Sequence, residues 1–206
     1  MELPKFAIFV AASFEAEPLA KLLQTHSLDF TVTPVGIGAI AAATGIEVNA
    51  QNARGRHAVF VGTCGSFAPF TAPELITPSR VLWLPTCERA GLSYSIPDTT
   101  PEISCENSGP LTSTLREAVV VCAPNISLSA LLPASLDGVK TVENVELYCC
   151  YRQLKDNALT LSVVLATTNE IGKNAHQQWK ANHKHAAQLT ADYLGKQIRN
   201  FAMKSS

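Results

Sequence analysis

Residues 59–67 read VFVGTCGSF, in which a short apolar run leads directly into the small residues Gly62 to Ser66. The apolar run is typical of a buried strand. The small residues predict a tight turn at the carboxyl end of that strand, where another group can come close to the backbone. Short apolar runs of this kind recur along the chain, and their arrangement predicts the fold.

Apolar runs alternate with longer amphipathic segments throughout the sequence. Strands that are apolar along their whole length and alternate with helices are typical of a largely parallel sheet covered on both faces. We therefore predict an α/β fold in which residues 1–206 form one three-layer domain, with helices flanking a central, mostly parallel mixed sheet. Residues 91–113, rich in Ser, Thr and Pro, are expected to form a long loop. The expected strands are 5–11, 30–35, 57–62, 80–84, 117–122 and 159–166. One helix is expected around Leu19, Leu22 and Leu23, which recur at helical spacing, and further helices are expected at 36–51, 143–155 and 174–200.

Composition excludes several classes of function. The 206 residues are 47% hydrophobic and 16% charged with a net charge of -1, so nucleic acid is not an expected partner. The six cysteines have no CxxC spacing, which indicates reduced core thiols and neither a disulfide framework nor a zinc site. The N-terminal stretch has no basic segment or cleavage site, and no apolar run is long enough to span a bilayer. We expect a cytoplasmic protein without a membrane partner.

Polar and small residues follow several of the expected strands at their carboxyl ends, where open α/β sheets bind ligands. Each has an ordinary structural explanation when taken alone, as a helix cap or a tight turn. Their joint placement points to a site. They are Glu15 and Glu17 after the first strand, Gly36 and Gly38 after the second, Gly62 to Ser66 after the third, Glu146 at the start of a helix and Asn169 after the last strand.

The order of these motifs resembles the superfamily of purine nucleoside phosphorylases and methylthioadenosine/S-adenosylhomocysteine nucleosidases, which includes futalosine hydrolases. The resemblance covers nearly the whole chain, through FAIFVAASFEAEPLAKLL, VGIGAIAAATG, FVGTCGSF, VENVELYCCY and VVLATTNEIGKNAHQQW. It implies a nucleoside phosphorylase-like fold that binds a small purine nucleoside. In that superfamily the glycine turn lies against the nucleophile and the ribose.

The resemblance also implies roles for individual residues. Glu15 would be the general base that deprotonates water, with Glu17 as the alternative, and Glu146 would accept hydrogen bonds from the ribose hydroxyls. Thr63 would hold the nucleophilic water. The remaining substrate-binding positions are Gly65, Ile126 and Val145, of which Val145 takes the place usually held by a methionine under the ribose.

Position 60 bears on the identity of the nucleophile. Phosphorylases in the superfamily typically carry arginine two residues before the glycine of this turn, because phosphate needs a cationic clamp. This chain has Phe60, which favours water as the nucleophile. Arg80, Arg89 or a partner subunit's residue could still supply the charge.

Asn169 stands where nucleosidases acting on adenine compounds carry an aspartate. A carboxamide can accept a hydrogen bond from N7-H and donate to a carbonyl at position 6, a pattern that suits hypoxanthine. Futalosine, a hypoxanthine nucleoside of menaquinone biosynthesis, is therefore the leading substrate. The asparagine could instead mark a slow or altered enzyme, which would favour 6-amino-6-deoxyfutalosine or methylthioadenosine.

The remaining features receive plain structural interpretations. Trp179 is expected in the core, and His176, His183 and His185 are expected in solvent without a metal. Hydrolysis of this bond requires no cofactor. The resemblance implies a homodimer, and the alternatives to futalosine hydrolysis are a methylthioadenosine/S-adenosylhomocysteine nucleosidase and a catalytically silent nucleoside-binding homologue.

Overall fold

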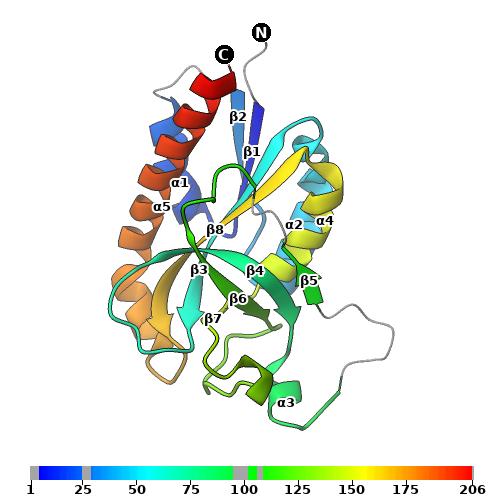
Figure 1. Cartoon of the computed structure of the whole chain (residues 1–206), viewed down its shortest axis with the longest axis vertical. Coiled ribbons are helices and arrows are strands. Elements are labelled where there is room, and N and C mark those ends of the chain that lie inside the picture. Colours follow the sequence, from blue (N-terminus) through cyan, green and yellow to red (C-terminus); the bar gives the residue numbers. More distant parts are fainter. Residues whose placement is uncertain (1–4, 25–28, 95–101, 106–108, 206) are drawn as a thin grey trace.

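The structure is a computed structural model that describes residues 5–24, 29–94, 102–105 and 109–205. Strands and helices alternate along most of the chain, as the apolar pattern predicts (Figure 1). The strands are β1 (Lys5–Val10), β2 (Asp29–Pro34), β3 (His57–Ser66), β4 (Leu75–Trp83), β5 (Glu102–Ser104), β6 (Arg116–Cys122), β7 (Thr141–Glu143) and β8 (Thr160–Glu170). The helices are α1 (Ser13–Gln24), α2 (Ala39–Asn49), α3 (Thr86–Arg89), α4 (Leu147–Asn157) and α5 (Ala175–Ser205), with 3-10 turns η1 (Ala50–Ala53) and η2 (Ala134–Leu136).

Two core clusters lie on opposite faces of the sheet. Along β1, Phe6, Ile8 and Val10 belong to one cluster, and Ala7 and Phe9 belong to the other. This alternation follows from the two-residue period of a strand, and both sets are apolar because both faces are covered. Helices α1 and α5 cover one face, and α2 and α4 cover the other (Figure 1). The predicted three layers are present in this part of the molecule.

The sheet is more mixed than the sequence predicts. Strands β2, β1, β3 and β8 run parallel, but β3 also pairs antiparallel with β7, and β4 pairs antiparallel with β8. With the parallel β7–β6 and β6–β4 pairs, this closes β3, β7, β6, β4 and β8 into a ring. The predicted mixed sheet is present, but in this half of the molecule it closes on itself and is not a mostly parallel sheet flanked by helices, because β3 and β8 are long enough to pair with additional strands.

The small residues after Phe60 are not a turn. Strand β3 continues through Gly62, Thr63, Cys64 and Gly65 to Ser66, and its pairing with β8 shifts register between Cys64 and Gly65. Strand β8 likewise continues to Glu170, so Asn169 lies inside a strand. Both extensions were missed because glycine, threonine and asparagine do not continue the apolar pattern from which the strands were predicted.

Other boundaries also differ from the prediction. The helix expected at 143–155 begins at Leu147, because residues 141–143 form β7. The strand expected at 80–84 begins earlier, at Leu75. The expected loop 91–113 contains the short strand β5, and its residues 95–101 and 106–108 lie outside the described part of the chain.

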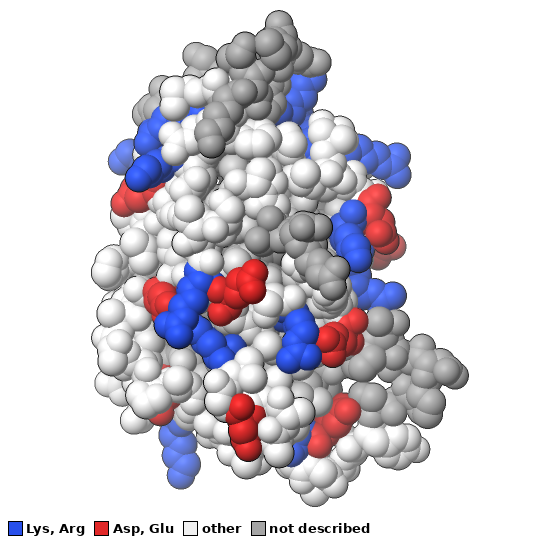
Figure 2. Space-filling model, in the orientation of Figure 1, with Lys and Arg blue, Asp and Glu red and all other residues white. Residues whose placement is uncertain are grey.

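Charged side chains of both signs are interspersed on the face shown in Figure 2. Glu74 pairs with both Arg116 and Lys140. This face has no continuous basic surface of the kind that binds a phosphate backbone. Within the described ranges, no helix combines the length and the apolar character needed to cross a bilayer.

Candidate active site

A cavity of about 500 Å³ lies at the carboxyl ends of β1, β3 and β8. These strands are parallel, so their carboxyl ends meet at one edge, where ligand sites of α/β sheets occur. The walls come from six segments that are distant in sequence. The lining includes Ala11, Ala12, Phe14 and Glu15, Ile37, Thr63 to Gly65, Ile126 and Leu128, Glu143 to Glu146, and residues of 168–179 from the end of β8 to the start of α5.

Glu15 is held at the start of α1 with its side chain 3% exposed. Its Oε2 accepts a hydrogen bond from the Ala12 backbone N–H at 3.0 Å, the contact that a glutamate at the third helical position makes in a capping box. Burial raises the pKa of Glu15 from 4.5 to about 8, against the lowering effect of the Ala12 N–H, and the Glu146 carboxylate adds to the rise. The residue therefore caps the helix and also presents a strongly perturbed carboxyl group to the cavity.

Glu146 lies at the N-cap position of α4 and is also buried. Its Oε1 accepts a hydrogen bond from the Gly38 backbone N–H at 2.8 Å. Gly38 has φ of +87°, a conformation that favours glycine, so the VGIG sequence shapes the turn that delivers this donor. Burial raises the pKa of Glu146. Glu15 and Glu146 both line the cavity, and the Glu146 carboxylate contributes to the raised pKa of Glu15.

Asn169 lies on β8 opposite Gly65 on β3. Its Oδ1 accepts from the Thr168 hydroxyl at 2.9 Å, and its Nδ2 donates to the Glu170 carbonyl at 3.1 Å. These two bonds fix which end of the amide carries the oxygen. Because an amide oxygen has two acceptor positions and an amide nitrogen two protons, one of each is left for a ligand.

Thr63, Gly65, Ile126 and Val145 also line the cavity, so the structure brings these predicted positions together with Glu15, Glu146 and Asn169. Glu17 does not join them. It is exposed on α1, two residues beyond Glu15, and is not part of the lining. Two residues at positions i and i+2 of a helix do not share a face, which explains why only one of the two glutamates reaches the site.

Asn144 is a site residue that the sequence analysis missed. Its Nδ2 donates to the Thr63 carbonyl at 2.9 Å, while its Oδ1 accepts from the backbone N–H groups of Glu146 and Leu147. The side chain therefore ties β3 to the beginning of α4. An asparagine two to three residues before a helix is a recognisable capping signal, and it could have identified this residue.

The prediction that Trp179 packs in the core is wrong. Trp179 lines the cavity, and its Nε1 donates a hydrogen bond to the Thr63 hydroxyl at 3.3 Å. The rings of His176 and His183 both stack with it, with ring centroids 5.8 and 4.6 Å away. His176 and His185 are exposed, as predicted, and His176 also lines the cavity. His183 is half-buried, so the prediction of a solvated side chain is wrong for His183 alone among the three.

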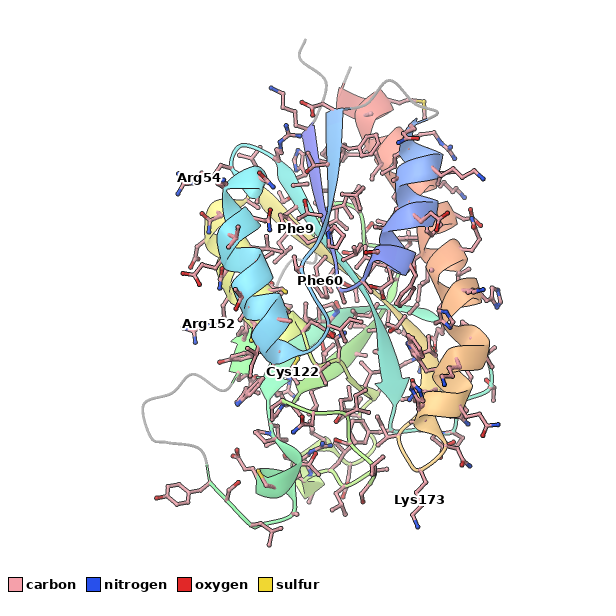
Figure 3. The ribbon with its side chains drawn as sticks, turned by 180° about the vertical axis from the view of Figure 1, so that it is seen from behind. Phe9, Arg54, Phe60, Cys122, Arg152 and Lys173 are labelled. Atoms are coloured by element: carbon pink, nitrogen blue, oxygen red, sulfur yellow. The ribbon has the colours of Figure 1, made fainter. Side chains whose placement is uncertain are left out.

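Phe60 does not line the cavity. It is fully buried on the α2 and α4 side of β3, among the core residues around Phe9, and lies inside the molecule in Figure 3. Phe60 in place of a phosphate-binding arginine is therefore weaker support for water as the nucleophile than the sequence suggested. The described lining contains no arginine, and its lysine, Lys173, extends away from the ribbon in Figure 3.

Arg80 and Arg89 are engaged elsewhere. Arg80 pairs with Glu102 at the surface, and Arg89 forms a buried pair with Glu143 at 2.9 Å. Neither guanidinium lines the cavity in the described part of the chain.

No protein-family model and no curated protein sequence matches this chain. Solved structures do match. They include a 5'-methylthioadenosine/S-adenosylhomocysteine nucleosidase from Helicobacter pylori (TM-score 0.74, 14% identity, covering 97% of this chain and 100% of that one) and the futalosine hydrolase of the same organism (TM-score 0.75, 15% identity, 96% and 98%). The Streptococcus pneumoniae methylthioadenosine/S-adenosylhomocysteine nucleosidase is also similar (TM-score 0.70, 13% identity, 97% and 99%). This chain has the fold of the methylthioadenosine/S-adenosylhomocysteine nucleosidases and of futalosine hydrolase, over nearly its full length.

Proposed function

We propose that the protein is a nucleosidase that hydrolyses the N-glycosidic bond of a 5'-modified purine nucleoside. The observation that carries this proposal is the arrangement of two buried carboxyl groups, Glu15 and Glu146, and the amide of Asn169 along one cavity. The fold shared with solved nucleosidases supports it.

Cleavage of an N-ribosidic bond needs an activated nucleophile, a bound ribose and stabilisation of the departing base. The sugar acquires cationic character in the transition state, so two carboxylates favour it electrostatically. Glu15 acts as the general base on water, and Glu146 accepts hydrogen bonds from the ribose hydroxyls. Thr63 holds the water, while Gly65, Ile126 and Val145 contact the substrate. Asn169 binds the leaving purine.

Water is the proposed nucleophile because the described lining has no arginine to bind phosphate. Lys173 and His176 are the basic side chains of that lining, and both belong to the segment after Asn169. The carboxyl groups of Glu15 and Glu146, once ionised, would repel a phosphate dianion. The lack of an arginine in the described lining and the presence of two carboxyl groups both favour a neutral nucleophile.

Futalosine is the leading substrate because the amide of Asn169 has one acceptor and one donor position left. These positions complement N7-H and the 6-carbonyl of hypoxanthine, which would place the enzyme in menaquinone biosynthesis. The second candidate is an adenine nucleoside, either 6-amino-6-deoxyfutalosine or methylthioadenosine, and the similarity to methylthioadenosine nucleosidases favours it. A silent nucleoside-binding homologue would bind purines without turnover.

We also propose a cytoplasmic homodimer. Large apolar side chains are exposed at and near α2: Ile37, just before the helix, and Ile40 and Val48 on it are exposed by 65%, 84% and 67%. Ile37 belongs to the cavity lining as well, so a second copy on this face would cover the open side of the site. The double variant Ile40→Glu/Val48→Glu is expected to sediment as a monomer, and an unchanged dimer would exclude this face as the interface.

The experiment that tests the function offers futalosine, 6-amino-6-deoxyfutalosine, methylthioadenosine and inosine separately in phosphate-free buffer, with base release followed by chromatography. Release of hypoxanthine from futalosine is expected. Release of adenine alone would overturn the substrate assignment, and turnover only after phosphate is added would overturn hydrolysis.

A further inference from the structure

One wall of the cavity is formed by an irregular segment with little support of its own. Along residues 124–131 the side chains are exposed except that of Ser127, which is 2% exposed. Ile126 and Leu128, on either side of it, line the cavity although they are 64% and 69% exposed. Apolar packing therefore does not fix the position of this wall.

Ser127 is anchored by a buried ion pair. Its backbone N–H donates to Glu143 Oε1 at 2.8 Å, and its hydroxyl hydrogen-bonds to Glu143 Oε2. Arg89 Nη2 donates to Glu143 Oε2 at 2.9 Å and also contacts the Ser127 hydroxyl. Arg89 Nη1 donates to the carbonyl of Leu131, at the end of the same segment, at 3.1 Å. The pair thus holds the wall segment at two points.

The pair is isolated from water. The side chains of Arg89 and Glu143 are 0% and 2% exposed. The Arg89 guanidinium also lies over the Phe67 ring, with its central carbon 5.3 Å from the ring centroid. A buried charge left without its partner is strongly unfavourable, so neither residue can leave this arrangement alone.

Glu143 also connects the wall to the carboxylate side of the cavity. It is the last residue of β7 and directly precedes Asn144, which is bonded to Thr63 and to the backbone of Glu146. One ion pair therefore joins the segment that carries Ile126 to the residues that position Glu146 and Thr63.

We propose that Arg89 and Glu143 are positioning residues that hold the Ile126–Leu128 wall in its ligand-binding position, so that their loss weakens substrate binding while the chemical step is preserved. This inference rests on the proposed function for its kinetic test only. Its structural test needs no substrate.

Arg89→Met removes the charge and keeps much of the side-chain volume. Hydrogen exchange is expected to accelerate in peptides covering 124–131, most at the Ser127 amide, whose acceptor loses its partner. For whichever nucleoside the wild type hydrolyses, KM is expected to rise by about tenfold or more with kcat within about threefold, the signature of lost uniform binding. Arg80→Met, which breaks the exposed Arg80–Glu102 pair, is the matched control and should change neither quantity.

Arg89→Lys restores the charge without the forked geometry and is expected to recover part of the KM loss. Glu143→Gln should reproduce the Arg89→Met effect, and it provides the test if Arg89→Met does not fold. Unchanged exchange at 124–131 in a folded Arg89→Met or Glu143→Gln variant would overturn the proposal. So would faster exchange with an unchanged KM. If no nucleoside is hydrolysed by the wild type, the function fails, while the exchange result still decides whether the pair holds the wall.

Discussion

A Cβ atom on Gly65 would lie 2.9 Å from the side-chain nitrogen of Asn169. It would also lie 2.6 Å from Ile171 Cδ1, and real Cβ atoms do not approach other atoms this closely. A Cβ atom on Gly62 would lie 3.3 Å from the side-chain nitrogen of Asn144, a less severe contact. The small residues after Phe60 therefore make room on β3 for two asparagine side chains.

Gly65→Ala is expected to displace Asn169 or Ile171. We expect it to lower the free energy of unfolding by about 1–3 kcal/mol, the usual cost of overpacking, and to weaken discrimination between hypoxanthine and adenine nucleosides. Denaturant unfolding and kcat/KM for both nucleosides measure these effects. Gly62→Ala is the comparison, because its tightest contact is less severe. A Gly65→Ala protein with unchanged selectivity would show that Asn169 is not held by this contact.

Asn169→Asp is expected to shift selectivity towards adenine nucleosides. A carboxyl group that is only 7% exposed favours its protonated form, which can donate its single proton towards N7. The hydrogen bond that the amide nitrogen donates to the Glu170 carbonyl is then given up. The ratio of kcat/KM for methylthioadenosine to that for futalosine should rise by roughly tenfold or more, the equivalent of one good hydrogen bond to a charged or protonated group. A ratio that falls or stays constant would contradict the assigned role of Asn169.

The raised pKa of Glu15 predicts the pH dependence of hydrolysis. A general base must be ionised, and Glu15 in the free protein becomes ionised only as the pH approaches about 8. The value of kcat/KM should therefore rise about tenfold per pH unit below this pKa and level off above it. A profile that is flat from pH 5.5 to 8.5 would mean that no group with this pKa controls the reaction.

The same pKa predicts the stability of Glu15→Gln. Between pH 4.5, the ordinary pKa, and about 8, the folded protein keeps a proton that the unfolded chain has lost, so the free energy of unfolding falls as the pH rises through this window. Glutamine does not ionise, so the variant does not lose this stability as the pH rises. Glu15→Gln should be more stable than the wild type by roughly 3 to 6 kcal/mol at pH 9, with the difference vanishing near pH 4. Urea unfolding at the two pH values measures it, and a variant less stable than the wild type at pH 9 would contradict the burial effect.

The sequence predicted the layered part of the fold because β1 and β3 are apolar on both faces, which is a strong signal. It did not predict the ring of β3, β7, β6, β4 and β8, since β7 has only three residues and β3 and β8 continue through polar positions. Strand pairing across such distances is not encoded in local periodicity.

The candidate site was predicted where strand ends carried carboxylates or amides, as at Glu15, Glu146 and Asn169. Trp179 was missed because a tryptophan on an amphipathic helix has the same pattern whether it packs in the core or lines a cavity. The pairing of Arg89 with Glu143 was missed because the two residues are 54 positions apart and meet only in the folded chain.

The central claim is that Glu15 activates water in this cavity, and the most direct test compares Glu15→Gln with Glu17→Gln in phosphate-free hydrolysis. Both substitutions remove one carboxylate from α1, but only Glu15 faces the cavity. We predict that Glu15→Gln lowers kcat by about 10²- to 10⁴-fold, the usual contribution of a general base, while leaving purine binding largely intact. Glu17→Gln should retain wild-type turnover. Wild-type turnover by Glu15→Gln would contradict the account.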